Sequence, residues 1–164
     1  MIRTYLLLCL VLFILAVPRE SVGQGGVLAE LNAIDIVVMD LTSFEKRLGL
    51  SKEAISNQVL VLLRSKVPRL IVTDTANSVV FIDVSVDAIR TTQDSNFGHY
   101  GYVVVSIGRQ VTIMETGRFG GGFIWLQHAG FNGPQPNLHG NINMALDQLL
   151  TAFAAAWYRD NPTK

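Results

Sequence analysis

Residues 79–90 read VVFIDVSVDAIR, a stretch in which aliphatic residues alternate with aromatic and polar ones. Successive side chains of a β-strand point to opposite faces, so this alternation predicts a strand with one buried face and one solvated face. Such strands are typical of antiparallel sheets that are covered on one side only. We expect Val80, Ile82, Val84, Val86 and Ala88 on the buried face, and Phe81, Asp83, Ser85, Asp87 and Ile89 on the other.

The neighbouring segments extend this sheet. Residues 100–115 alternate in the same way, whereas residues 31–41 (LNAIDIVVMDL) are apolar on both faces, which is typical of a central strand. Short strands are also predicted over 69–73 and 123–128. In the segment 100–115 we expect Val103, Val105, Ile107, Val111 and Ile113 to point inward, and Tyr102, Ser106, Gln110 and Thr112 to point outward.

Two segments have helical periodicity. Ser51 is a good N-cap for a helix over 52–67, and Pro68 ends that helix. A second helix is predicted over 141–159. Their apolar stripes comprise Ile55, Val59, Leu62 and Leu63 in the first helix, and Ile142, Leu146, Leu149, Phe153 and Trp157 in the second. Turns or loops are predicted at 74–78, 91–98, 116–122 and 129–140.

The order of the elements predicts the architecture. A strand–helix–strand start implies a right-handed crossover and a parallel pair, whereas later strands joined by short turns should run antiparallel. We therefore expect one α+β domain over residues 24–164, a two-layer sandwich in which two helices cover one face of a mixed, mostly antiparallel five-stranded sheet. The other face, with Asp83, Ser85 and Asp87, should stay open or meet a partner.

The N-terminus has the pattern of a secretory signal peptide. Arg3 precedes an apolar run over residues 6–17 (LLLCLVLFILAV), which is followed by Pro18 and then by polar and small residues. This is the order of the basic, apolar and cleavage regions of such peptides. The run is shorter than the roughly 20 apolar residues that a transmembrane helix needs. We expect removal of residues 1–23, after Gly23; an uncleaved anchor is the alternative.

Composition narrows the class of protein. The chain has 13 basic and 13 acidic residues, with 49% hydrophobic and 16% charged residues. These values exclude intrinsic disorder, which needs low hydrophobicity, and a nucleic-acid binder, which needs a basic excess. Removal of residues 1–23 also removes Cys9, the single cysteine, so the mature chain has no disulfide and no thiolate ligand. Secreted eukaryotic domains of this size usually carry disulfides. We therefore expect a bacterial protein that is periplasmic or secreted.

Two short motifs resemble a group of small, uncharacterised exported bacterial proteins. Members of this group read GL(S/T)KE before a helix and end in F…Y…NP. The corresponding residues here are Gly49, Leu50, Ser51, Lys52 and Glu53, and then Phe153, Tyr158, Asn161 and Pro162. The strand order also resembles the N-terminal domain of TolB and related anticodon-binding-like folds. The resemblance covers most of the mature chain and implies a fold and an exported location; no catalytic residue is carried over from it.

His99, His128 and His139 are the candidates for a metal site or a general base. No two of them form an i, i+4 pair or an H-E-x-x-H motif. They either converge at one edge of the sheet and bind zinc, or lie separately in loops and at strand ends. We predict no cofactor and no bound metal. A small-ligand or metal-binding protein that uses these loop histidines is the alternative function, and an enzyme with its site in the 129–140 loop is a third hypothesis.

The remaining candidates suit contacts with a protein. The segment 116–122 (TGRFGGG) lacks the Lys and Ser/Thr of a phosphate-binding loop and runs into a strand. Its Arg118 and Phe119 belong to residue types that are enriched at interface hot spots. Tyr100 and Tyr102 add aromatic area without basic residues between them. We therefore predict a non-enzymatic interaction or accessory protein of the cell envelope. Its partner would be a protein or a second copy bound through these four residues, with no nucleic acid and no membrane span after cleavage.

Overall fold

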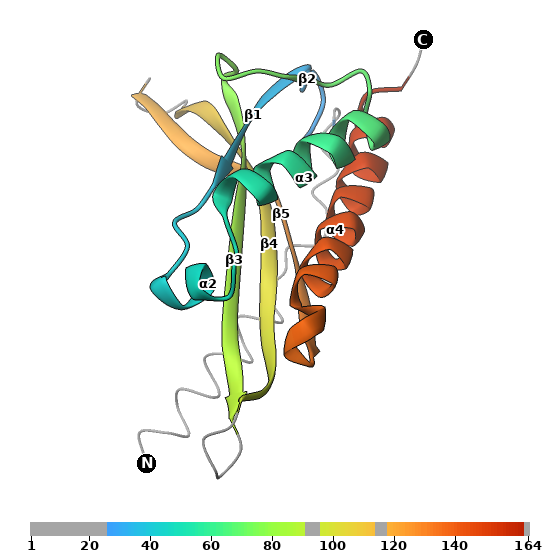
Figure 1. Ribbon diagram of the computed structural model, residues 1–164. Helices are drawn as coiled ribbons and strands as arrows, with labels where there is room; N and C mark the ends of the chain where they lie inside the picture. Colours follow the sequence, from blue (N-terminus) through green and yellow to red (C-terminus); the bar gives the residue numbers. More distant parts are fainter. Residues whose placement is uncertain (1–25, 91–95, 114–117, 163–164) are drawn as a thin grey trace, which may run out of the picture.

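The computed structural model of the chain describes residues 26–90, 96–113 and 118–162 (Figure 1). Its elements are β1 (Ala33–Val38), α2 (Ser43–Arg47), α3 (Lys52–Lys66), β2 (Ile71–Val72), β3 (Ser78–Arg90), β4 (Asn96–Ile113), β5 (Arg118–Gly133), the short 3-10 helix η1 (Gln135–Asn137) and α4 (Leu138–Asp160). The predicted signal peptide, residues 1–23, lies outside the described residues. None of the helices in the described ranges is long and apolar enough to cross a membrane.

The strands form one open, mixed sheet of five strands in the order β2-β1-β3-β4-β5. β1 runs parallel to β2 and to β3, whereas the pairs β3–β4 and β4–β5 are antiparallel. α3 and α4 lie on the same side of this sheet (Figure 1), which confirms the predicted α+β fold. We call the side that these helices cover the inner face of the sheet, and the opposite side the outer face.

The connection between β2 and β3 differs from the prediction. The turn at 74–78 predicts an antiparallel pair, and this is wrong, because both strands run parallel to β1. β2 spans only two residues beside the start of β1, and residues 73–77 then bring the chain to the other side of β1. A central strand has two edges whose backbone groups need hydrogen-bonding partners. β2 and β3 therefore each satisfy a different edge of β1.

β5 is much longer than the predicted strand 123–128. It includes residues 118–122 of the predicted glycine-rich turn and residues 129–133 of the predicted loop 129–140, so both of those predictions are wrong there. Its pairing with β4 is continuous apart from one register shift after Ile107. Glycine weakens a strand because it has no side chain to pack, but the backbone pairing with β4 supplies the hydrogen bonds in this case. α4 also starts earlier than predicted, at Leu138 and not at residue 141.

α2 is a short helix that the sequence analysis missed. Its signal is the capping box of Thr42 and Glu45. Thr42 Oγ1 accepts the Glu45 N–H at 3.2 Å, and Glu45 Oε2 accepts the Thr42 N–H at 2.7 Å. The second carboxylate oxygen, Glu45 Oε1, accepts the N–H of Val86 in β3 at 3.2 Å. The buried Glu45 thus attaches α2 to the edge of β3 beyond the end of β1.

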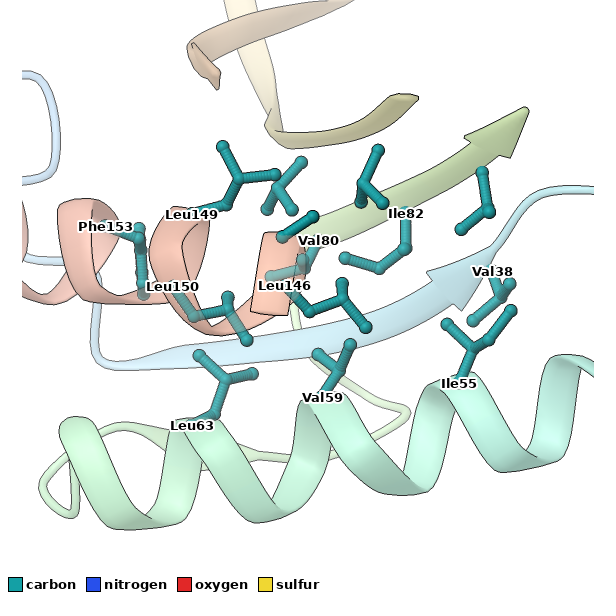
Figure 2. Close-up of a cluster of buried hydrophobic side chains, with 14 of the residues drawn as sticks. Val38, Ile55, Val59, Leu63, Val80, Ile82, Leu146, Leu149, Leu150 and Phe153 are labelled. Carbon is teal, nitrogen blue, oxygen red and sulfur yellow. The ribbon is translucent and has the colours of Figure 1, made fainter. Parts of the chain in front are cut away.

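The core lies between the inner face and the two long helices (Figure 2). Alternate residues of β1, β3 and β4 supply one layer of it, and apolar stripes of α3 and α4 supply the other. The predicted inward residues Val80, Ile82, Val84, Val86, Val103, Val105 and Ile107 are all buried, as are Ile55, Val59, Leu63, Leu146, Leu149 and Phe153 of the helices. The alternation read from the sequence is therefore confirmed along these parts of β3 and β4. The side chains of residues 110–113 lie outside the described ones.

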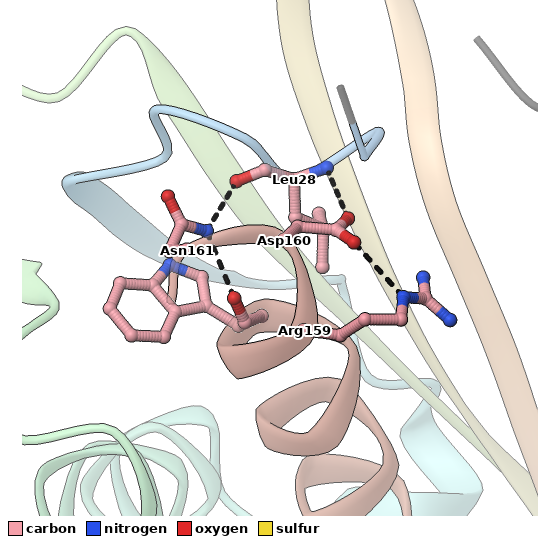
Figure 3. A network of polar contacts seen from close by, with 5 residues as sticks. Leu28, Arg159, Asp160 and Asn161 are labelled. Carbon is pink, nitrogen blue, oxygen red and sulfur yellow. Dashed lines mark hydrogen bonds and ion pairs between the residues drawn. The ribbon is translucent and has the colours of Figure 1, made fainter. Parts of the chain in front are cut away.

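The end of α4 holds the start of the described chain (Figure 3). Asp160 Oδ2 accepts the Leu28 N–H at 3.0 Å, and Asn161 Nδ2 donates to the Leu28 carbonyl at 2.8 Å. The Glu30 N–H donates to Asn161 Oδ1 at 3.0 Å. We call these three hydrogen bonds the terminal clamp. They give Asn161, one of the residues of the C-terminal motif, a structural role.

Candidate interaction surface

α3 and α4 leave the outer face of the sheet uncovered (Figure 1). In β3 the outer face carries the odd-numbered residues, because Val80 and Ile82 are buried beneath the helices. The register places Phe81 beside Val37 of β1 and Ser106 of β4 on the same side. The larger or polar side chains that the register places on the outer face are Asp35, Val37, Val79, Phe81, Asp83, Ser85, Asp87, Tyr100, Tyr102, Val104, Ser106, Phe123, Leu126, His128 and Asn132. Met39, which directly follows β1, continues the alternation, since its N–H donates to the Ile82 carbonyl and its side chain is exposed.

Large apolar side chains on this face are open to solvent. Phe123 is 66% exposed, Leu126 is 53% exposed and Met39 is 46% exposed. Val37 of β1 is exposed as well. The solvated face of an antiparallel sheet is normally polar, and a contiguous exposed apolar patch marks an interaction site. The outer face is thus more apolar than the wet face that the sequence predicts.

Phe81 and Phe123 form an aromatic pair on the outer face. Their ring centroids are 5.8 Å apart and their planes are at 84°, an edge-to-face contact. Gly108 of β4 makes room for the pair, because a Cβ at this position would come within 2.6 Å of the Phe81 ring. The register shift after Ile107 places Phe123 opposite Gly108. The pair therefore depends on a glycine at position 108, where a larger residue would displace the Phe81 ring.

Two carboxylates border this apolar surface. Asp83 and Asp87 are exposed on β3. Their partners across the β3–β4 register are Val104 and Tyr100, so no basic residue stands opposite them. Across the described ranges of the chain, neither carboxylate takes part in an ion pair. The outer face therefore combines an apolar centre with unneutralised negative charge along β3.

The four predicted partner-binding residues fall into two groups. Tyr100 and Tyr102 are exposed on the outer face. Arg118 and Phe119 belong to β5 rather than to a turn, and their backbones lie opposite residues 113 and 112. The side chains of Arg118 and Phe119 lie outside the described ones. The structure therefore brings only the two tyrosines into the described surface.

Sequence reasoning missed the most exposed apolar members of the face. Val37 and Met39 belong to the segment 31–41, whose apolar residues on both faces predict a strand that is covered on both sides. The covered side is confirmed, but the other side is open. Phe123 and Leu126 belong to a segment whose alternation is broken by the register shift of β5. The available signal was the excess of apolar residues on the outward positions of the strands.

The three histidines do not converge. His99 lies on the inner face in β4, His128 lies on the outer face in β5, and His139 lies in the first turn of α4. They lie separately, as the second alternative has it, with His99 and His128 in strands, but His139 lies in a helix and the predicted loop there is wrong. A zinc site shared by all three is wrong, because His99 and His128 lie on opposite faces of the sheet. No cluster of three or more metal-ligating side chains forms within the described ranges.

His99 has an unusual environment for a histidine. It is 2% exposed and packs against Phe131 with ring centroids 5.8 Å apart. Its Nε2 is 3.3 Å from Asn141 Nδ2, which also donates to the Asn132 carbonyl at 3.1 Å. Because an amide nitrogen is a donor, Nε2 accepts and the proton of the neutral ring is assigned to Nδ1. Nδ1 has no hydrogen-bond partner among the described residues, and burial lowers the pKa of His99 below 6.5.

Comparisons with protein families and with characterised proteins found no match to this chain. Among solved structures, the chain is similar to a PelC dodecamer from Paraburkholderia phytofirmans, with 11% identity and a TM-score of 0.47 over 79% of this chain and 93% of that chain. It is also similar to a minor lipoprotein from Acinetobacter baumannii, with 10% identity and a TM-score of 0.35 over 79% of this chain and 95% of that one.

Proposed function

We propose that the chain is an exported accessory protein of the bacterial cell envelope. In this proposal it binds another envelope protein through the outer face of its sheet and catalyses no reaction. The observation that carries the proposal is the uncovered outer face with its exposed residues Met39, Phe123 and Leu126. Burial of exposed apolar surface is the dominant favourable contribution to most protein–protein association, and exposed apolar patches mark interaction sites.

The chemistry of the face indicates the kind of partner. Its centre is apolar and aromatic, which favours a partner surface of similar character. Asp83 and Asp87 add negative charge that no basic neighbour neutralises in the described structure. Complementary charge raises association rates and selects the partner. We therefore expect a protein with an apolar contact surface and Lys or Arg residues placed to meet β3.

The exported location rests on the N-terminal pattern. An apolar run over 6–17 after Arg3 is typical of a signal peptide. The measurement is N-terminal sequencing of the tagged protein recovered from fractionated bacterial cells. We expect Gln24 as the first residue in the periplasmic or secreted fraction. A full-length chain in the cytoplasm would contradict this part of the proposal.

The binding proposal is tested by a matched pair of double variants. Val37→Ser with Met39→Ser removes apolar area from the outer face. Val61→Ser with Met144→Ser removes the same residue types from α3 and α4, where Val61 is 61% and Met144 is 71% exposed. Each tagged variant is used to recover crosslinked proteins from its native envelope. Because exposed serines leave the core intact, both variants should fold like the parent.

We expect the outer-face variant to lose its principal partner about tenfold or more relative to the parent, since the buried apolar area is lost. The helix variant should recover that partner at the level of the parent. Equal recovery by both variants would contradict the use of the outer face.

A further inference from the structure

β5 is the long free edge of the sheet. It lies at one end of the strand order, and no strand of the described chain pairs with the edge of β5 that faces away from β4. The opposite edge, β2, spans only two residues. β3 is also open beyond the end of β1, but α2 lies there and Glu45 accepts the Val86 N–H. A free edge is a template for pairing with another chain. The described chain thus covers part of the β3 edge but adds no strand to the β5 edge.

The hydrogen-bond pattern shows which backbone groups of β5 point to the free edge. The Met39 N–H donates to the Ile82 carbonyl, so even-numbered residues of β3 direct their backbone groups to β1. The direction of the backbone N–H and C=O groups alternates from residue to residue, so the odd-numbered residues of β4 point to β5. Beyond the register shift, the even-numbered residues of β5 therefore point their N–H and C=O groups to the side that faces away from β4. These residues are Leu126, His128, Gly130 and Asn132. The Asn132 carbonyl already accepts from the Asn141 side chain, which agrees with this assignment.

β5 has a bulge at its register shift, which is one device that prevents edge pairing, but beyond the bulge its edge has no charged residue and no proline. Its sequence RFGGGFIWLQHAGFNG has no Lys, no Pro and no acidic residue, and its single Arg stands at the first position. Lys, Pro and inward charges are the usual protection of natural edge strands. Two copies of this strand can therefore approach without like charges facing each other. Removal of residues 1–23 leaves 11 basic and 12 acidic residues, so copies of the mature chain, with a net charge of −1, repel each other only weakly at long range.

We propose that β5 pairs antiparallel with β5 of a second copy, over the residues between the register shift and Gly133. Such a pairing is isologous and closes as a two-fold dimer. It joins the two sheets into one and places the two outer faces side by side. The exposed Leu126 would then be covered by the second copy. This dimer goes beyond the proposed function, which does not require it.

A matched pair of Gly→Lys variants tests the pairing. A Cβ at Gly130 would meet no atom closer than 3.8 Å, and one at Gly140 in α4 would meet none within 4 Å. Both sites therefore accept a lysine, and both variants change the charge equally. Sedimentation velocity of the mature protein is measured across the micromolar range.

We expect a dimer for the parent and for Gly140→Lys, and a monomer for Gly130→Lys, whose lysines would stand at the dimer contact. A monomeric parent, a dimeric Gly130→Lys variant, or the same loss in both variants would overturn the proposal.

Cysteine crosslinking gives a second measurement. The only cysteine, Cys9, lies in the predicted signal peptide, so each cysteine variant of the mature chain has a single thiol. His128→Cys places this thiol at the middle of the free edge, and Gln148→Cys places it on the exposed side of α4. We expect a disulfide-linked dimer from the first variant and not from the second. If Gly130→Lys becomes monomeric and still recovers the envelope partner, the dimer and the proposed function are separate properties of the chain.

Discussion

The ring of His99 is buried on the inner face with Nδ1 unpaired, although histidine is usually partly exposed. Leaving a buried donor without a partner costs about 1–3 kcal/mol. The other ring nitrogen, Nε2, accepts a hydrogen bond from Asn141 Nδ2. Gly133 leaves room for this contact, because a Cβ at that position would come within 2.8 Å of Asn141 Nδ2. His99 is thus packed against Phe131 on one side and bonded to Asn141 through Nε2.

The burial of His99 predicts a pH-dependent stability. Its pKa is lowered by burial, so the unfolded state binds a proton more readily than the folded state. The stabilising contribution is complete above the unfolded value of about 6.5 and is lost as the pH falls below it. We expect the free energy of unfolding to fall by at most about 1.4 kcal/mol per pH unit from this group.

The measurement is urea unfolding of the parent and of His99→Leu between neutral and mildly acidic pH. The leucine variant should show a weaker loss of stability on acidification than the parent. His139→Leu, at an exposed position of α4, serves as the control and should behave like the parent. Equal pH dependence in the parent and in His99→Leu would contradict the assignment.

At the scale of elements, α2 is short, and its capping carboxylate also bonds β3. Glu45 satisfies the N–H groups of Thr42 and Val86. Glu45→Ala should therefore destabilise the fold by about 1–3 kcal/mol, because two N–H groups lose a charged acceptor. The amide of Val86 should also exchange its hydrogen faster. Hydrogen exchange and urea unfolding measure both effects, and Glu53→Ala, at an exposed position in the first turn of α3, is the control. If the exchange rate of the Val86 amide is unchanged in Glu45→Ala, Glu45 does not stabilise the edge of β3.

Most elements could be predicted because their periodicity is undisturbed. β3 and most of β4 follow strict alternation, and α3 starts at the predicted cap Ser51. β5 could not be predicted at its full length, because its glycines read as turns and its register shift breaks the alternation. The parallel pairing of β1 with β2 follows from the strand–helix–strand order and is confirmed. The placement of β3 on the other edge of β1 could not be predicted, because no local pattern says which edge of β1 a following strand takes. The outer face was missed in part for a similar reason, since apolar residues on both sides of β1 look the same whether one side is covered or not.

At the scale of the whole molecule, the terminal clamp links the two ends of the described chain. Asn161 contributes its amide to both Leu28 and Glu30, and Trp157 Nε1 donates to the Leu31 carbonyl at 2.7 Å nearby. Asn161→Ala leaves these backbone groups without their partner. We expect a loss of about 1–3 kcal/mol in the free energy of unfolding.

The control for the clamp is Asn143→Ala on the exposed side of α4, which should cost less than about 0.5 kcal/mol. Urea unfolding of both variants, at the same pH, gives the comparison. Equal free energies of unfolding for the two variants would contradict the structural role that we assign to Asn161.

The central claim concerns the outer face as a surface for another envelope protein. The most direct measurement is photo-crosslinking in living cells, with a photoreactive amino acid at position 39 of the outer face and, as the control, at position 144 of α4. Position 39 lies in the loop that follows β1, on the side of the sheet away from β5, so its products separate partner binding from β5 pairing. We predict a product with a second envelope protein from position 39 and none from position 144. Identical products from both positions, or no product from position 39, would contradict the claim.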